Sequence, residues 1–176
     1  MSVLKKDKVY TSRRVEPFYQ IAVNPYREKI NNEKLLIIGA GAIGVEFASF
    51  YNDFNCEVVL VELQNKILPS EDQEISDIAR KLFEKSGINI LTNTKVSNLE
   101  SNNKGISVLL ESSDGKKIKK SFDKSILAIG IEANVENIGL ENLNIKLEDG
   151  RIKTDECGLT SQPGVFAFGD VTGSPW

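Results

Sequence analysis

Three glycines that follow an apolar run carry the clearest chemical signal in this chain of 176 residues. Gly39, Gly41 and Gly44 form the pattern G-x-G-x-x-G directly after the run Leu35–Ile38. The first glycine allows a tight turn out of a strand, and the second has no Cβ, so a phosphate can approach the backbone. The third lets the following helix pack closely against the sheet. The pattern therefore predicts a strand, a turn and a helix around a phosphate site.

The start of the expected helix and a carboxylate further along the chain complete this candidate site. The chain enters this helix past Gly44, and the free N–H groups and positive end of the helix would face a pyrophosphate, with Ala42 and Ile43 also expected to contact the cofactor. Glu62 follows a second apolar strand, Glu57–Val61, at the spacing expected for an acid that accepts hydrogen bonds from an adenosine ribose. Together these features predict a dinucleotide site. The alternative is a βαβ unit without a ligand, in which Glu62 is a solvated strand end.

Composition and charge narrow the classes of function. The net charge of −3, with 27% charged residues, gives no electrostatic argument for binding nucleic acid or a membrane. No apolar run is long enough to cross a bilayer and no signal peptide is visible, so we expect a cytoplasmic protein. The sequence contains no histidine, and its two cysteines, Cys56 and Cys157, do not form a C-x-x-C or C-x-x-x-x-C pair. We expect Cys56 to be a small core residue rather than a reactive thiol.

The elements around the candidate site alternate between strand and helix, which predicts a parallel α/β sheet. A third strand is expected at Ile88–Leu91. The helix before it should start at Ser70, with Gln73 completing a capping box, and should end at Gly87. Its buried face is expected to consist of the apolar residues at helical spacing: Ile75, Ile78, Ala79, Leu82 and Phe83.

Residues 95–122 alternate between apolar and polar with a period near two, which predicts an antiparallel meander. Turns are expected at Asn102–Gly105 and Asp114–Gly115. The run Lys116–Lys120 is typical of the solvated face of a strand, the alternative being a binding patch. Two more buried strands should follow, at Ser125–Gly130 and Val165–Asp170. The predicted fold class is therefore α/β, a Rossmann-like parallel sheet with an inserted antiparallel β-meander.

Four separated motifs occur in an order that resembles one known family. They are IIGAGAIGVEFASFY, then VVLVE with ILPSEDQEI, then LAIGIEANVENIGLE, and finally TSQPGVFAFGD. This order resembles the NAD-binding part of the pyridine nucleotide–disulfide oxidoreductases, and within them the dihydrolipoamide dehydrogenases. The resemblance covers residues 33–174. It implies three parts: residues 1–32 as a leader of unclear structure, 33–150 as the NAD-binding domain, and 151–176 as a remnant of the segment that returns to the FAD domain.

The resemblance also implies roles for individual residues. Glu46 would lie near the nicotinamide and the flavin; the alternative is an exposed helix position. Gly130 would approach the cofactor with its backbone, the alternative being a simple strand-ending glycine. The remaining implied contacts are the NAD pyrophosphate for Gly39, Gly41 and Gly44, the adenosine ribose for Glu62, the adenine for Val96, and the FAD ribitol for Asp170.

The sequence departs from the family pattern in the parts that carry the redox chemistry. A family enzyme needs an N-terminal FAD-binding Rossmann unit, a C-x-x-x-x-C disulfide, and an interface domain with a His–Glu pair through which it forms homodimers. None of these appears in this sequence. We therefore expect an NAD-binding portion that is inactive alone, with NAD as its cofactor and FAD belonging to the complete enzyme. The alternatives are a fragment of another flavin disulfide reductase, or a non-catalytic nucleotide-binding or interaction module.

Overall fold

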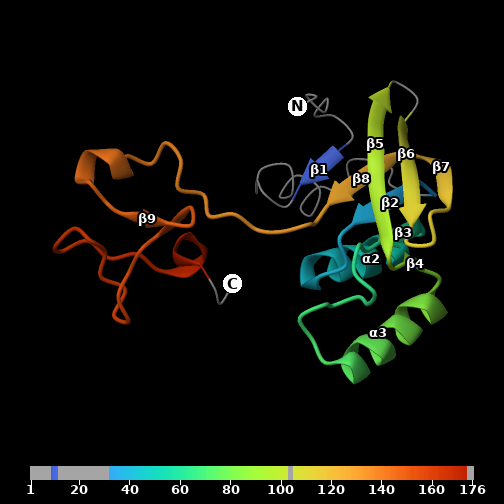
Figure 1. Ribbon diagram of the computed structural model, residues 1–176, viewed down its shortest axis with the longest axis horizontal. Helices are drawn as coiled ribbons and strands as arrows, with labels where there is room; N and C mark the ends of the chain where they lie inside the picture. The colour runs from blue at the N-terminus through green and yellow to red at the C-terminus, as the bar shows by residue number, and fades with distance from the viewer. Residues whose placement is uncertain (1–8, 12–31, 103–104, 174–176) are drawn as a thin grey trace. The chain divides into compact units, whose positions relative to one another are not determined.

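The computed structural model describes residues 9–11, 32–102 and 105–173, and these fall into two compact units (Figure 1). The first unit is Met1–Gly130 and the second is Ile131–Trp176. The predicted boundary after residue 150 lies inside the second unit. Most of the predicted leader, residues 1–8 and 12–31, lies outside the described residues, as does part of the predicted turn at Asn102–Gly105.

The first unit is built on a five-stranded parallel sheet with strand order β1-β8-β2-β3-β4. This confirms the predicted fold class, and the predicted strands coincide with the observed ones within a few residues. The short edge strand β1 lies in the stretch that was expected to be a leader. The strands are β1 (Val9–Thr11), β2 (Lys34–Ile38), β3 (Glu57–Val61), β4 (Asn89–Leu91) and β8 (Lys124–Leu127).

The two central strands β2 and β3 are buried on both faces, which explains why they are continuous apolar runs rather than alternating ones. Leu35 and Ile37 face the same core as helix α2 (Ala42–Asp53), whereas Leu36 faces a second core on the opposite side of the sheet. The buried residues of α2 are Gly44, Val45, Ala48 and Tyr51, with Phe47 and Phe50 packed against their edge.

Helix α3 (Gln73–Ser86) differs from the expectation at its start and on its buried face. Its N-cap is Asp72 rather than Ser70. Ile75, Ile78 and Leu82 are 51%, 49% and 62% exposed, so the predicted apolar face is wrong at three of its positions. Because α3 packs beside the edge strand β4, only a narrow line of the helix reaches the core: Ser76, Ala79 and Phe83. The predicted C-cap, Gly87, is confirmed in the left-handed conformation with φ +108°.

The opposite face of the sheet is covered by the predicted meander (Figure 1). Its three strands pair antiparallel in the order β5-β6-β7, and Ile106, Val108, Leu110 and Phe122 share a core with Leu36, Val59 and Val61. Asn98 has φ +49° where the β5–β6 register shifts. The strands are β5 (Thr94–Asn102), β6 (Gly105–Ser112) and β7 (Lys117–Phe122).

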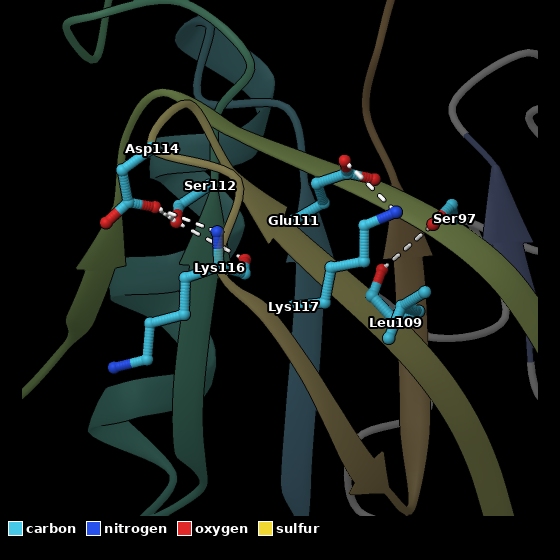
Figure 2. A network of polar contacts seen from close by, with 7 residues as sticks. All are labelled: Ser97, Leu109, Glu111, Ser112, Asp114, Lys116 and Lys117. Atoms are coloured by element: carbon cyan, nitrogen blue, oxygen red, sulfur yellow. Dashed lines mark hydrogen bonds and ion pairs between the residues drawn. The ribbon is translucent and has the colours of Figure 1, made fainter.

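The turn between β6 and β7 is closed by the carboxylate of Asp114, as Figure 2 shows. This carboxylate accepts hydrogen bonds from the hydroxyl of Ser112 and from the backbone N–H of Lys116, and both bonds hold its pKa below the usual value. The following Lys117 forms an ion pair with Glu111 across the two strands at 3.3 Å. Apart from Lys120, which is half-buried, the predicted lysine run is exposed, in agreement with a solvated face.

The second unit has little regular structure, and one predicted strand in it is wrong. It contains the 3-10 helices Leu140–Leu143 (η1) and Gly169–Thr172 (η2), and a short hairpin of β9 (Leu147–Glu148) and β10 (Arg151–Ile152). Where a strand was predicted at Val165–Asp170, only Phe166 forms a bridge, with Leu159. The apolar residues Phe166 and Phe168 are exposed and stack on each other with centroids 6.4 Å apart. Gly169, with φ +76°, then leaves the extended conformation.

The packing of α3 predicts which apolar residues stabilise the domain. Ile78→Gln should change the free energy of unfolding by no more than about 0.5 kcal/mol, because the side chain is half exposed. Phe83→Ala should cost more than about 1 kcal/mol, because it leaves a gap beside the core. Urea denaturation followed by circular dichroism measures both. Equal losses for the two variants would mean that the outer face of α3 is buried in solution.

Candidate functional site

The glycine turn and Glu62, two of the features predicted to bind a dinucleotide, lie at one edge of the parallel sheet. Because β2, β3 and β8 run in the same direction, their carboxyl ends share this edge. Gly39 follows β2, Glu62 follows β3, and Ala128 follows β8. The edge where these strands end is the usual place for a ligand in an open parallel sheet.

The first position of the pattern must be glycine, because its backbone lies in close contact with the end of the neighbouring strand β8. Gly39 has φ +98°, and its N–H donates a hydrogen bond to the carbonyl of Val61 at 2.8 Å. A Cβ at Gly39 would lie 2.4 Å from the carbonyl oxygen of Ala128. Both the conformation and the space therefore exclude a side chain at this position.

The third glycine lets the helix approach the turn. A Cβ at Gly44 would lie 1.9 Å from the carbonyl oxygen of Gly39 and 3.7 Å from Cβ of Ala128. The expected close packing of helix on sheet is therefore present, and the nearest atom belongs to the turn itself.

The second glycine faces open space. A Cβ at Gly41 would meet no atom within 4 Å, and its φ of −71° is open to any residue. Gly41 is the N-cap of α2, no side chain of the described residues caps this helix end, and its first turn contains no acidic residue. The first N–H groups of a helix have no partners within the helix, and they carry its positive end. The turn therefore fits an anionic group such as a pyrophosphate.

The carboxylate of Glu62 is buried and hydrogen-bonded to the backbone rather than free. Only 8% of this residue is exposed. Its Oε2 accepts a hydrogen bond from the N–H of Ala40 at 2.7 Å, and its Oε1 accepts one from the N–H of Gln64 at 2.9 Å. Glu62 is therefore not a solvated strand end, while a βαβ unit without a ligand stays an alternative. A carboxylate has about four acceptor positions, so acceptor capacity for a ribose hydroxyl remains.

The structure adds Leu68, which sequence reasoning missed. Its N–H donates to the carbonyl of Ala40 at 2.7 Å, inside the glycine turn. Leu68 has φ +46°, an uncommon conformation for a leucine. No motif marks this residue, because its contribution comes from the backbone.

The other predicted residues lie at different places. Ala42 is exposed and Ile43 half-buried at the start of α2, and Glu46 is exposed one turn later. Gly130 is exposed with φ +150°, just beyond the end of β8. Val96 lies on β5, opposite Leu110, and is half-buried against the core beneath the meander. Asp170 belongs to the second unit, where it is exposed in η2.

The two thiols differ in environment. Cys56 is buried, as expected, and its pKa is raised by burial and by the carboxylate of Glu33. Cys157 is exposed in the second unit. Within the described residues no cluster of histidine, cysteine and acidic side chains could hold a metal ion. No helix in the same part of the chain is long and apolar enough to cross a membrane.

The two glycines of the turn should respond differently to a side chain. Gly41→Val should leave the domain folded at a cost of about 1 kcal/mol or less, since valine is a poorer N-cap than glycine but its side chain would enter open space. The same variant should lose NADH affinity, because that space is where the phosphates are expected. Gly44→Ala should cost more than about 1 kcal/mol through overpacking against the carbonyl of Gly39. Thermal unfolding and a fluorescence titration with NADH separate the two effects. Undiminished binding by Gly41→Val would show that the phosphates lie elsewhere.

Comparisons with known proteins identify the family and the fold of this chain. Residues 9–176 match the family described as pyridine nucleotide-disulphide oxidoreductase. Dihydrolipoyl dehydrogenase of Zymomonas mobilis is 50% identical over 143 residues, which are 81% of this chain and 31% of that protein. The Rhizobium etli dihydrolipoyl dehydrogenase is 43% identical over 81% of this chain and 30% of its own length. A solved NAD-dependent persulfide reductase from A. fulgidus superposes with a TM-score of 0.75 at 27% identity, over 94% of this chain and 29% of that one. The chain thus spans about a third of its relatives, and it belongs to the pyridine nucleotide-disulphide oxidoreductase family.

Proposed function

We propose that the first unit is the NAD-binding part of a flavoprotein disulfide oxidoreductase of the dihydrolipoyl dehydrogenase type. The observation that carries this proposal is the open space at Gly41 in front of the N-terminus of α2, which no side chain of the described residues caps. Anion binding needs free N–H groups and room for the ligand, and this turn supplies both. The sequence similarity to dihydrolipoyl dehydrogenases supports this type of enzyme as the complete protein.

In this proposal each residue at the sheet edge has a separate part in holding NAD. The turn at Gly41 and the first N–H groups of α2, including those of Ala42 and Ile43, bind the pyrophosphate. Glu62 accepts a hydrogen bond from the adenosine ribose with its remaining lone pairs. Gly130 borders the cofactor with its backbone, while Glu46 lies toward the nicotinamide and Val96 toward the adenine. Bound NAD⁺ supplies a hydride acceptor, and the protein supplies binding and orientation.

The rest of the parent reaction belongs to groups outside this unit. Electrons would pass from dihydrolipoamide to a disulfide, to FAD and then to NAD⁺, in a homodimeric cytoplasmic enzyme. In that enzyme Asp170 would contact the FAD ribitol. A non-catalytic nucleotide-binding module is the second candidate, and it is favoured by the cysteines, because Cys56 and Cys157 do not form a C-x-x-x-x-C pair and Cys56 is buried.

A preference for NADH over NADPH follows from the charge at the end of β3. The 2′-phosphate of NADPH would meet the carboxylate of Glu62, and such a mismatch typically costs about ten- to a hundred-fold in affinity. Lys66, the nearest candidate cation along the chain, instead donates a hydrogen bond to the carbonyl of Glu71. Calorimetric titration with both nucleotides measures the ratio. Equal affinities would refute the assignment, and Glu62→Gln should reduce the ratio.

The isolated chain should not catalyse NAD⁺ reduction by dihydrolipoamide. It has no histidine to act as a base, a role that typically contributes about 10²–10⁴-fold in rate, and its two cysteines cannot form the exchanging disulfide. The assay follows NADH absorbance with and without added FAD, and the spectrum of the purified chain reports bound flavin. Turnover at an enzymatic rate, or a stoichiometric flavin band, would overturn this part of the proposal. NADH binding without turnover is the expected result.

A further inference from the structure

We propose that the segment Glu62–Leu68 positions the glycine turn before any nucleotide arrives, with Glu62 as the main positioning residue. Both backbone groups of Ala40, at the middle of the turn, are held by this segment. The N–H of Ala40 donates to Oε2 of Glu62, and its carbonyl accepts from the N–H of Leu68, each at 2.7 Å. The inference rests on the proposed function only in taking this turn as the phosphate site.

The segment can hold the turn because it is itself anchored at several points. The N–H of Glu62 donates to the carbonyl of Leu91 at 2.8 Å, and its carbonyl accepts from Thr94 at 3.0 Å, which fixes it to the end of β4 and the start of β5. The side chain of Ile67 is completely buried in the core shared with α2. The carbonyl of Leu68 accepts a hydrogen bond from the hydroxyl of Ser76 on α3 at 3.3 Å.

The chemistry of the carboxylate makes Glu62 difficult to replace in this role. It receives two backbone N–H groups, one from Ala40 in the turn and one from Gln64 in its own segment. Glutamine has the same size but only one acceptor oxygen, so its NH₂ group would face one of the two N–H groups. A buried N–H left without an acceptor is unfavourable, so the Ala40 peptide would lose its fixed orientation.

A turn that is held in place beforehand loses less conformational freedom when the phosphates bind. Glu62 would then contribute to NAD affinity by two routes, directly through the ribose and indirectly through the Ala40 peptide. The direct route needs the ribose hydroxyls, whereas the indirect route does not. This difference makes the two routes separable by experiment.

The first experiment combines the variant Glu62→Gln with two ligands, NADH and an NADH analogue whose adenosine ribose lacks the 2′ and 3′ hydroxyls. If Glu62 positions the turn, the variant should bind the analogue about tenfold or more weakly than the wild-type protein does. If the substitution has no effect on analogue binding, Glu62 acts through the ribose alone and the inference is wrong. Glu57→Gln is the matched control. It removes a carboxylate from the other end of β3, where it forms an exposed ion pair with Lys34 at 3.3 Å, and should not change either affinity.

The second experiment uses the protein without ligand, so it holds whether or not NAD binds. Amide hydrogen exchange measured by NMR should accelerate at Ala40 by about tenfold or more in Glu62→Gln, and not in Glu57→Gln. Ile67→Val, which loosens the anchor while keeping the carboxylate, should accelerate exchange at Ala40 and Leu68 more than at Leu36 in β2. An unchanged exchange rate at Ala40 in Glu62→Gln and in Ile67→Val would overturn the inference. Wild-type protein that does not bind NADH, with exchange altered as expected, would overturn the proposed function alone.

Discussion

The contact between the glycine turn and helix α2 is the constraint on which the first unit depends. The space for a Cβ at Gly44 is taken by the carbonyl oxygen of Gly39, only 1.9 Å away, and the space at Gly39 is taken by the carbonyl of Ala128. Three backbone segments, the end of β2, the start of α2 and the end of β8, therefore meet with no side chain at Gly39 or Gly44 between them. This close approach sets the direction of α2 across the sheet, and it leaves the N-terminus of the helix facing the open space at Gly41.

The parts of the fold that the sequence predicts well are those in which local and tertiary requirements agree. Strands β2 and β3 are buried on both faces, so a continuous apolar run was a reliable signal. The meander alternates because one face packs on the sheet and the other meets solvent, as at Val108 and Lys119. The prediction for the buried face of helix α3 is wrong because its local pattern and its tertiary surroundings disagree. Its apolar spacing is helical, but its place beside an edge strand leaves too little core for all of Ile75, Ile78 and Leu82. The strand predicted around Phe166 is wrong for a similar reason. Apolar residues alone do not make a strand, which also needs a neighbouring backbone to pair with along its length.

The glycine turn of the candidate site was predictable from residue type, whereas the backbone hydrogen bonds that hold this turn were not. The roles of the three glycines could be predicted from residue type. Only glycine tolerates the close backbone contacts at positions 39 and 44, and a glycine at position 41 leaves the space beside it open. Glu62 could be assigned from its place after β3, but its hydrogen bonds to Ala40 and Gln64 could not, since any residue offers the same N–H group. The N–H of Leu68 cannot be inferred from the sequence either, although its hydrogen bond to the carbonyl of Ala40 holds the next peptide group of the turn.

The position of Glu62 links cofactor preference to the order of the turn. In the proposed NAD site, the carboxylate at the end of β3 disfavours a 2′-phosphate by its charge, while its Oε2 holds the turn proposed to receive the pyrophosphate. Replacing the acid by a small neutral residue, the simplest way to admit NADPH, would remove the repulsion and also release the peptide. The gain for NADPH at the ribose would then be offset by a loss for both nucleotides at the phosphates. A change of preference that keeps affinity therefore requires a second acceptor for the Ala40 N–H, supplied by another residue at the same edge of the sheet.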